Sequence, residues 1–131
     1  MKIGLTCGAF DLCHAGHMLM FKECKDRCDH LIVGLQTNPQ IDRPEKNRPV
    51  MSLFERTRIL KSIKFIDEIF VYETEADLLN FLKDIKPDIR FVGIDWKDKP
   101  FTGAELPIKV IFNSRDHGFS SSELRERIKK S

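Results

Sequence analysis

At 131 residues and 15.2 kDa, the chain has the size of one folded domain and can bury a core without disulfides or structural metals. Its 22 basic and 20 acidic residues leave a net charge of +2, which is too balanced to indicate nucleic-acid binding through overall charge. No apolar run approaches the roughly 18 residues of a membrane-spanning helix, and the amino terminus lacks the apolar region of a signal peptide. We therefore expect a single cytoplasmic domain, residues 1–131, with neither nucleic acid nor membrane as a partner.

The sequence alternates short β-prone runs with segments in which apolar residues recur at helical spacing. In chain order, the pattern predicts strand 2–7, helix 15–25, strand 30–35, a loop with three prolines at 37–50, a helix from the Ser52/Glu55 capping box to about residue 64, strand 68–72, helix 75–86, strand 89–93, a loop at 95–105, strand 107–112 and helix 120–130. This alternation implies right-handed crossovers. The expected fold class is α/β: a Rossmann-like, doubly wound parallel sheet of five strands, with ligands at the carboxyl ends of the strands.

Four cysteines lie within the first 28 residues, and a chain without an export signal is expected to keep them reduced. Cys24 and Cys28 are four residues apart on an expected helix, and together with His14, His17 and His30 they offer the ligand types of a zinc site. A zinc-stabilised regulatory domain is therefore one alternative to an enzyme. Buried thiols on a helix face are the simpler interpretation.

Two segments have the composition of an anion site. In the run from Gly8 to His17, glycines leave room for a ligand beside the backbone, and two histidines lie three apart at the start of a helix. Unpaired N–H groups and the positive end of the helix dipole attract phosphate at such a position. The second segment, residues 42–64, carries seven basic and three acidic residues. The first segment predicts a cradle for a triphosphate, and the second is the best candidate for a further anion contact.

The run G-x-F-D-x-x-H-x-G-H at residues 8–17 resembles the first signature of the cytidylyltransferase family, within the HIGH-type nucleotidyltransferase superfamily. The family's second signature, R-T-E-G-I-S-T-T, is matched by residues 115–122, which keep the arginine, the glycine and a hydroxyl triplet. The resemblance covers essentially the whole chain and is greatest to glycerol-3-phosphate cytidylyltransferases, which share the Gly93-x-Asp95-Trp96 element. It implies transfer of CMP from CTP to a phosphorylated small alcohol, with glycerol 3-phosphate as the leading candidate. It also implies Mg²⁺ and a homodimer.

The resemblance further assigns roles to individual residues. The histidines would donate hydrogen bonds to the triphosphate, and the start of the last helix would hold the β- and γ-phosphates. The implied catalytic residues are His14, His17, Lys46 and Arg115. The implied nucleotide-binding residues are Gly8, Ala9, Phe10, Asp11, His14, Gly16, His17, Asp95, Trp96, Arg115, Gly118, Phe119, Ser120, Ser121 and Ser122, with Asp11 expected to brace its loop. The implied acceptor-binding residues are Lys46, Arg48 and Lys64, and no side chain is expected to ligate the metal.

Some positions depart from the glycerol-3-phosphate enzymes. Residues 73–77 are acidic where those enzymes carry a tryptophan and a lysine, and Lys64 stands where an arginine is expected. Sister families with a similar first signature adenylate heptose phosphate, pantetheine phosphate or flavin mononucleotide. One alternative is therefore an adenylyltransferase that uses ATP with a sugar phosphate or a similar phosphomonoester. Another is a nucleotide-binding sensor without turnover.

Overall fold

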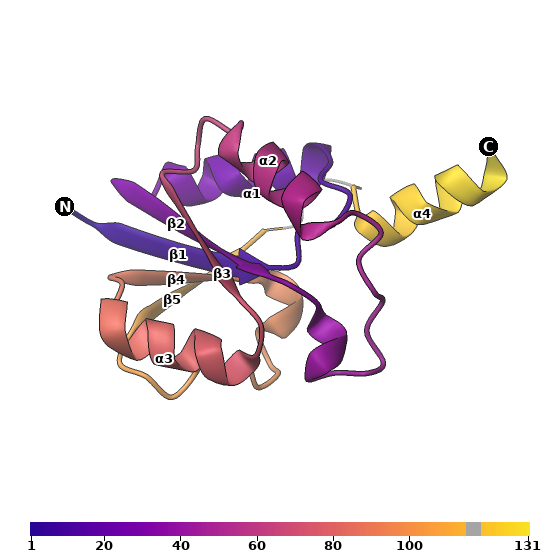
Figure 1. The fold of residues 1–131 in the computed structure, drawn as a ribbon. Helices are drawn as coiled ribbons and strands as arrows, with labels where there is room; N and C mark the ends of the chain where they lie inside the picture. Colours follow the sequence, from indigo (N-terminus) through magenta and orange to yellow (C-terminus); the bar gives the residue numbers. More distant parts are fainter. Residues whose placement is uncertain (115–118) are drawn as a thin grey trace.

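The computed structural model describes residues 1–114 and 119–131, which form one five-stranded parallel sheet with helices on both faces (Figure 1). The strand order is β3-β2-β1-β4-β5, so β1 lies at the centre and pairs with both β2 and β4. The α/β, doubly wound fold predicted from the sequence is confirmed. The elements are β1 (Ile3–Gly8), α1 (Ala15–Lys25), β2 (His30–Gln36), the 3₁₀ turn η1 (Pro39–Ile41), α2 (Leu53–Lys61), β3 (Glu68–Tyr72), α3 (Glu75–Ile85), β4 (Ile89–Gly93), the 3₁₀ turn η2 (Ile94–Trp96), β5 (Lys109–Asn113) and α4 (Ser121–Lys130).

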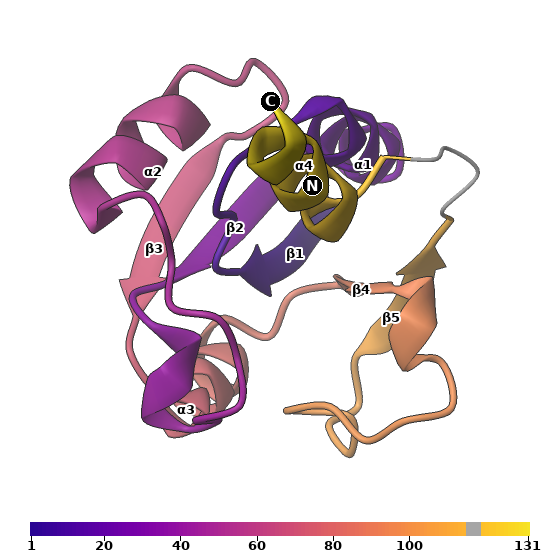
Figure 2. The ribbon, with the colours of Figure 1, turned by 90° about the vertical axis from the view of Figure 1, so that its right-hand side faces the viewer.

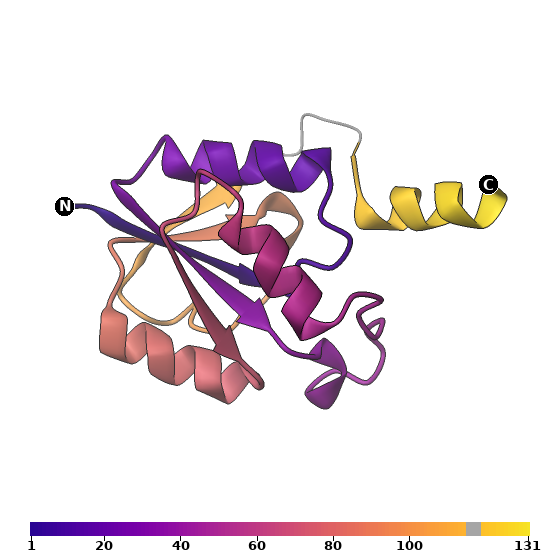
Figure 3. The ribbon, with the colours of Figure 1, turned by 45° about the horizontal axis from the view of Figure 1, so that its top comes forward.

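Alternate residues of the strands feed two separate apolar cores. On one face, α1 and α2 pack against the sheet through a cluster that includes Phe21, Leu60 and Phe91. On the other face, α3 contributes Leu78 and Leu82 to a second cluster. Figures 1 and 3 show this arrangement, with α1 and α2 on one side of the strands and α3 on the other. Because the winding direction changes between β1 and β4, the loops that leave these two strands flank the position where such sheets bind ligands.

Two element boundaries differ from the sequence prediction. Helix α2 ends at Lys61 and not near residue 64, because Ser62 caps it and the chain then turns so that the Ile63 side chain enters the core. Strand β5 begins at Lys109 and not at 107, since Pro107 has no N–H group to donate to a neighbouring strand. The remaining helices and strands lie within one or two residues of their expected bounds.

Helix α4 lies beyond the carboxyl ends of the strands and not on either face of the sheet (Figures 1 and 2). None of its residues is buried. Its amino end therefore stands over the edge where β1 and β2 end, next to the predicted site. Within the described parts of the chain, no helix is long and apolar enough to cross a bilayer.

Candidate functional site

The two histidines of the signature form the start of α1 through a reciprocal capping arrangement. His14 is the N-cap residue, and its Nδ1 accepts a hydrogen bond from the Gly16 N–H at 3.0 Å. The His17 Nδ1 accepts from the His14 N–H at 3.1 Å, and the two ring centroids lie 4.2 Å apart. Because both Nδ1 atoms act as acceptors, the proton of each neutral ring is on Nε2. The backbone thus selects the tautomer in which Nε2 is a hydrogen-bond donor.

Asp11 braces this loop, as the sequence prediction expected. Its carboxylate is 8% exposed and accepts hydrogen bonds from the Val50 and Met51 N–H groups at 2.7 and 2.9 Å. The Arg125 guanidinium of α4 donates to the same carboxylate at 2.9 Å. With its oxygens occupied in this way, Asp11 joins three segments and has little capacity left to ligate a cation.

Arg56 is a structural residue of the site that sequence reasoning missed. It is 3% exposed, and its guanidinium donates to the backbone carbonyls of Ala9, Gln36 and Thr37 at 2.7 to 3.0 Å. A further bond reaches the Met51 carbonyl at 3.1 Å. Burial lowers the pKa of Arg56, and the Asp11 carboxylate opposes this shift. The signal in the sequence was an arginine at a position of α2 that faces the core.

The hydroxyl triplet lies at the amino end of α4, where it meets the first signature. Ser120 is the N-cap and accepts from the Glu123 N–H at 3.0 Å, whereas the Ser121 Oγ lies 3.3 Å from the His14 Nε2. Ser122 and Phe119 are exposed. The structure therefore brings Ser121 of the second signature to His14. Arg115 and Gly118, which the sequence also placed here, lie outside the described residues.

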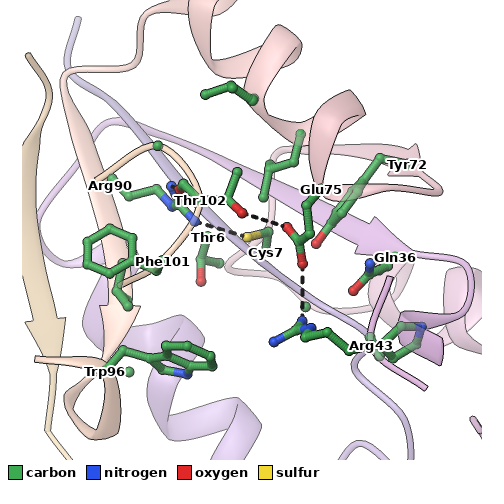
Figure 4. Close-up of a pocket in the computed structure, with 18 of the residues that line it drawn as sticks. Thr6, Cys7, Gln36, Arg43, Tyr72, Glu75, Arg90, Trp96, Phe101 and Thr102 are labelled. Carbon is green, nitrogen blue, oxygen red and sulfur yellow. Dashed lines mark hydrogen bonds and ion pairs between the residues drawn. The ribbon is translucent and has the colours of Figure 1, made fainter. Parts of the chain in front are cut away.

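A pocket of about 860 Å³ opens beside this loop, on the α3 face of the sheet (Figure 4). Gly8 and Ala9 of the signature line it, as do Lys46 and Trp96. The Lys46 Nζ lies 5.9 Å from the centre of the Trp96 ring, which brings the basic loop and the β4–β5 connection together. The volume is in the range of small-ligand sites. The histidine loop and the pocket thus share a boundary at the end of β1.

Several further residues of the pocket were not anticipated from the sequence. Arg43 of the basic loop donates to Glu75 Oε1 at 3.1 Å, and the Thr102 hydroxyl donates to Glu75 Oε2 at 3.1 Å. Glu75 therefore links three segments across the pocket, as the dashed lines in Figure 4 show. Glu75 belongs to the acidic segment 73–77, which differs from the glycerol-3-phosphate enzymes. This difference was the one feature of the sequence that could have pointed to Glu75. Arg90 of β4 lines the opposite side.

Asp95, Arg48 and Lys64 are predicted binding residues that do not line this pocket. Asp95 and Arg48 are exposed and do not line it. Lys64 is not brought to the site, which corrects the prediction that it binds the acceptor. Helix α2 runs from the carboxyl edge of the sheet back to the amino end of β3, so Lys64 lies at the opposite edge, 5.2 Å from the Phe65 ring centre.

The described residues contain no group of three or more His, Cys, Asp or Glu side chains that could hold a metal ion. The cysteines and histidines of the zinc alternative are therefore not assembled. Cys24 donates instead toward the Asn113 side chain, and burial raises its pKa to about 12. A zinc ligand must be a thiolate, and this environment opposes thiolate formation.

A family model described as cytidylyltransferase-like matches residues 5–127. The chain is 38% identical over 131 residues to the "Bifunctional protein HldE" of Campylobacter jejuni subsp. jejuni serotype O:6, a match that covers 98% of this chain and 28% of the relative. It is 34% identical over 130 residues to the HldE protein of Helicobacter pylori strain HPAG1, with the same coverage. The chain thus spans about 28% of the length of these relatives.

Two solved structures share the fold. The lipopolysaccharide core biosynthesis protein from Thermoplasma volcanium has a TM-score of 0.63 at 24% identity, over 99% of this chain and 88% of that one. A bifunctional NMN adenylyltransferase/ADP ribose pyrophosphatase from Francisella tularensis, complexed with AMP and a manganese ion, has a TM-score of 0.66 at 16% identity, over 98% of this chain and 42% of that one.

These comparisons overturn the substrate prediction. The relatives named above are HldE proteins and not glycerol-3-phosphate cytidylyltransferases. The prediction of CMP transfer from CTP to glycerol 3-phosphate is therefore wrong, and the findings favour the adenylyl alternative. The physical reason lies in the signature itself. Residues 8–17 were expected to contact phosphate groups, which all nucleoside triphosphates share, so they carry no information about the base.

Proposed function

Because this chain belongs to the cytidylyltransferase-like family of nucleotidyltransferases, we propose that it transfers AMP from ATP to a sugar phosphate or a similar phosphomonoester and releases pyrophosphate. The match to the family model over residues 5–127 confirms the family that was predicted from residues 8–17 and 115–122. The observation that carries the proposed chemistry is the pair of histidine rings at the amino end of α1, with Nδ1 fixed by the backbone and Nε2 as the donor.

The choice of ATP and of a sugar acceptor rests on the relatives. The Francisella protein is named as a bifunctional NMN adenylyltransferase and has AMP bound, and the Thermoplasma protein is named as a lipopolysaccharide core biosynthesis protein. Over the aligned segment, which is 98% of this chain, the two HldE relatives named above are 38% and 34% identical to it. Within the chain, a pocket of about 860 Å³ with hydrogen-bonding groups on several sides has the size and polarity for a phosphorylated sugar.

The reaction needs positioning and charge stabilisation from the protein. A phosphate oxygen of the acceptor attacks the α-phosphorus of ATP in line. One P–O bond forms there as the bond to the bridging oxygen of the β-phosphate breaks, and that electron pair leaves with pyrophosphate. The acceptor phosphate is already ionised near neutral pH, so no protein nucleophile is required. His14 and His17 would donate to the triphosphate oxygens as negative charge shifts toward the leaving group.

The remaining residues of the second signature and the basic loop would hold the two substrates. Ser121 stands next to His14, at a helix start that favours an anion, and would contact the outgoing phosphates together with Arg115. Lys46 lines the pocket beside Trp96 and would contact the phosphates of both substrates. These roles extend the sequence prediction for the nucleotide and acceptor sites.

We expect a divalent cation, proposed to be Mg²⁺, that is held mainly by the phosphates of the substrates. The described residues assemble no set of three metal-ligating side chains, and the Asp11 carboxylate is occupied by Val50, Met51 and Arg125. Phosphate oxygens would therefore supply most of the ligands, as Mg²⁺ commonly requires. When bound, the ion would neutralise charge on the triphosphate.

A pyrophosphate-release assay tests the proposal. The protein is incubated with ATP or CTP, Mg²⁺ and a panel of hexose and heptose phosphates, polyol phosphates and amino-alcohol phosphates. We expect pyrophosphate with ATP and at least one sugar phosphate, together with a nucleoside diphosphate-sugar of the expected mass. Turnover with CTP but not with ATP would refute the choice of ATP. Binding of ATP without pyrophosphate release from any acceptor would instead support the sensor alternative.

The homodimer also remains a proposal. Exposed apolar side chains on and before α4, Phe119 at 42% and Ile128 at 54%, are compatible with a partner surface there. Sedimentation equilibrium of the purified chain measures the oligomeric state directly, and a monomer at all concentrations would contradict this expectation.

A further inference from the structure

Arg90 is a buried cation in the middle of an otherwise apolar strand. It occupies β4 between Ile89 and Phe91, pairs in register with Leu5 of β1, and is 5% exposed. Its neighbours in sequence enter the core on the α1 and α2 face, whereas Arg90 lies on the α3 face and lines the pocket. A charged residue at such a position is rare unless its charge is balanced.

The partners of the Arg90 guanidinium do not balance its charge. Nη1 donates to the Thr102 carbonyl at 2.6 Å, and Nη2 donates toward the Cys7 Sγ at 3.5 Å. The guanidinium carbon lies 5.5 Å from the Phe101 ring centre. Nε is buried and has no hydrogen-bond partner. Within residues 1–114 and 119–131, no carboxylate forms an ion pair with Arg90.

The contrast with Arg43 on the other side of the pocket is informative. Arg43 also has a buried Nε without a partner, but its charge is compensated by Glu75 at 3.1 Å. A buried cation without a counter-charge costs free energy that a bound anion can recover. The Nε–Nη2 edge of a guanidinium is suited to bidentate binding of a phosphate or carboxylate, and at Arg90 this edge meets only a thiol, which is a weak acceptor.

The surrounding chain holds the Arg90 side chain in this place. Gly103 has a φ of +85°, and a Cβ there would lie 2.7 Å from the Leu82 Cδ1 and 3.2 Å from the Arg90 Nη1. The 100–105 segment can therefore pack closely over the guanidinium only with glycine at this position. Cys7 contacts Arg90 (Figure 4) and directly precedes Gly8 of the first signature. The guanidinium therefore lies close to the start of the loop formed by residues 8–17.

We propose that Arg90 supplies the counter-charge for an anionic group of the acceptor, its phosphate in the first instance, inside the pocket on the α3 face. This inference rests on the proposed function, because it assumes a phosphorylated acceptor. It gives the acceptor a cationic contact that the sequence prediction had sought at Arg48 and Lys64. The alternative is that Arg90 has only a structural role, in which it holds the 100–105 segment by donating to the Thr102 carbonyl.

Substitution by methionine separates the two accounts. Arg90→Met keeps the length and apolar contacts of the side chain but removes the charge. The thermal midpoint of the unliganded protein is expected to stay equal or rise, because a buried unbalanced charge is lost. Addition of a hexose 1-phosphate, with the nucleotide site filled by a non-hydrolysable ATP analogue, should raise the midpoint of the wild type but not that of Arg90→Met. Arg58→Met, at an exposed position on α2, is the matched control and should respond like the wild type.

Kinetics give a second measurement if the methionine variant does not fold. Arg90→Lys keeps a positive charge and loses the planar fork. The KM for the acceptor should rise about 10- to 100-fold, with the KM for ATP unchanged. An unchanged acceptor KM in Arg90→Lys, or a sugar-phosphate response retained by a folded Arg90→Met protein, would overturn the proposal. The thermal experiment needs no turnover, so a failed ATP assay and a failed Arg90 assignment are distinguishable.

Discussion

The carboxylate of Asp11 accepts a hydrogen bond from the Arg125 guanidinium at 2.9 Å, so the first loop and the last helix meet across most of the chain. The same carboxylate holds the N–H groups of Val50 and Met51. Three segments that carry predicted site residues are thereby fixed to one buried side chain. The proposed phosphate site depends on this arrangement because α4 has no buried residue of its own to hold it in place.

Asp11→Ala should lower both stability and activity. The change leaves two backbone N–H groups and a guanidinium without their acceptor, which predicts a loss of about 2–4 kcal/mol in the free energy of unfolding. Arg125→Ala should cost about 1 kcal/mol or less, because the Arg125 side chain is 26% exposed and its interaction is screened by solvent. Urea denaturation of both variants measures the two values. Equal losses would mean that the bonds to Val50 and Met51 contribute nothing.

His14 should have two separable tasks, since its two ring nitrogens have different partners. His14→Asn retains an acceptor near the Nδ1 position, so it should keep the helix cap and lose the Nε2 donor. His14→Gln retains a donor near the Nε2 position and should lose the cap. We expect His14→Asn to unfold near the wild-type temperature with turnover reduced about 10²- to 10³-fold. His14→Gln should show the reverse tendency, with lower stability and partial turnover.

The measurement is a melting curve and a pyrophosphate-release rate for each His14 variant. His14→Ala, which lacks both groups, serves as the reference for complete loss. If His14→Asn restored full turnover, the Nε2 atom would have no role in transfer and the capping bond alone would explain the histidine.

The fold was predictable because it follows from strong local patterns. Apolar runs of strand length alternate with amphipathic helices, and the Ser52/Glu55 capping box is formed as expected, with Ser52 N–H donating to Glu55 at 2.9 Å. The boundaries that were missed depend on tertiary packing. Helix α2 stops early because Ile63 enters the core, and no local signal at that residue records where the core lies.

The site was predictable where a residue's neighbours in sequence are also its neighbours in space. The spacing of His14 and His17 placed both rings together at the start of a helix, which the structure confirms, but it did not indicate that their Nδ1 atoms accept from the backbone. The place of Arg90 in the lining of the pocket was not anticipated, because this pocket is built from separate segments that only the sheet brings together. The base and acceptor were mispredicted for a related reason, since the motif that was recognised was expected to contact only the phosphates, which all candidate nucleotides share.

Arg56 should be the most sensitive structural position of α2. Its guanidinium satisfies four carbonyls from three segments of the chain, and a lysine has neither the planar fork nor the number of donors to replace it. Arg56→Lys is expected to lower the free energy of unfolding by about 2–4 kcal/mol. Arg58→Lys, on the same helix but exposed, should change it by less than about 0.5 kcal/mol. Urea denaturation measures both values. An equal loss of free energy of unfolding in the two variants would show that the effect comes from placing lysine in this helix and not from the buried hydrogen bonds of Arg56.

Stability should fall on the alkaline side because of one buried thiol, Cys24, and one half-buried thiol, Cys13. Burial raises the pKa of Cys24 to about 12, and burial with the nearby Asp11 carboxylate raises the pKa of Cys13 to about 11, both from an ordinary value of 9.0. A raised pKa in the folded state means that the unfolded chain loses its protons first. The stabilisation is therefore complete below pH 9 and is lost as the pH rises from about 9 toward 11 and 12.

Urea denaturation at about pH 8 and about pH 10.5 measures this dependence. The free energy of unfolding should be lower at the higher pH, and the decrease should be smaller in Cys24→Ala than in the wild type. The comparison uses the difference between the two pH values, so the small cavity left by alanine, which lowers stability at both, cancels. Burial raises the pKa of Tyr72 as well, but Tyr72 is common to both proteins, so its contribution does not affect the comparison. An identical decrease in Cys24→Ala would show that the Cys24 thiol keeps its ordinary pKa in the folded protein.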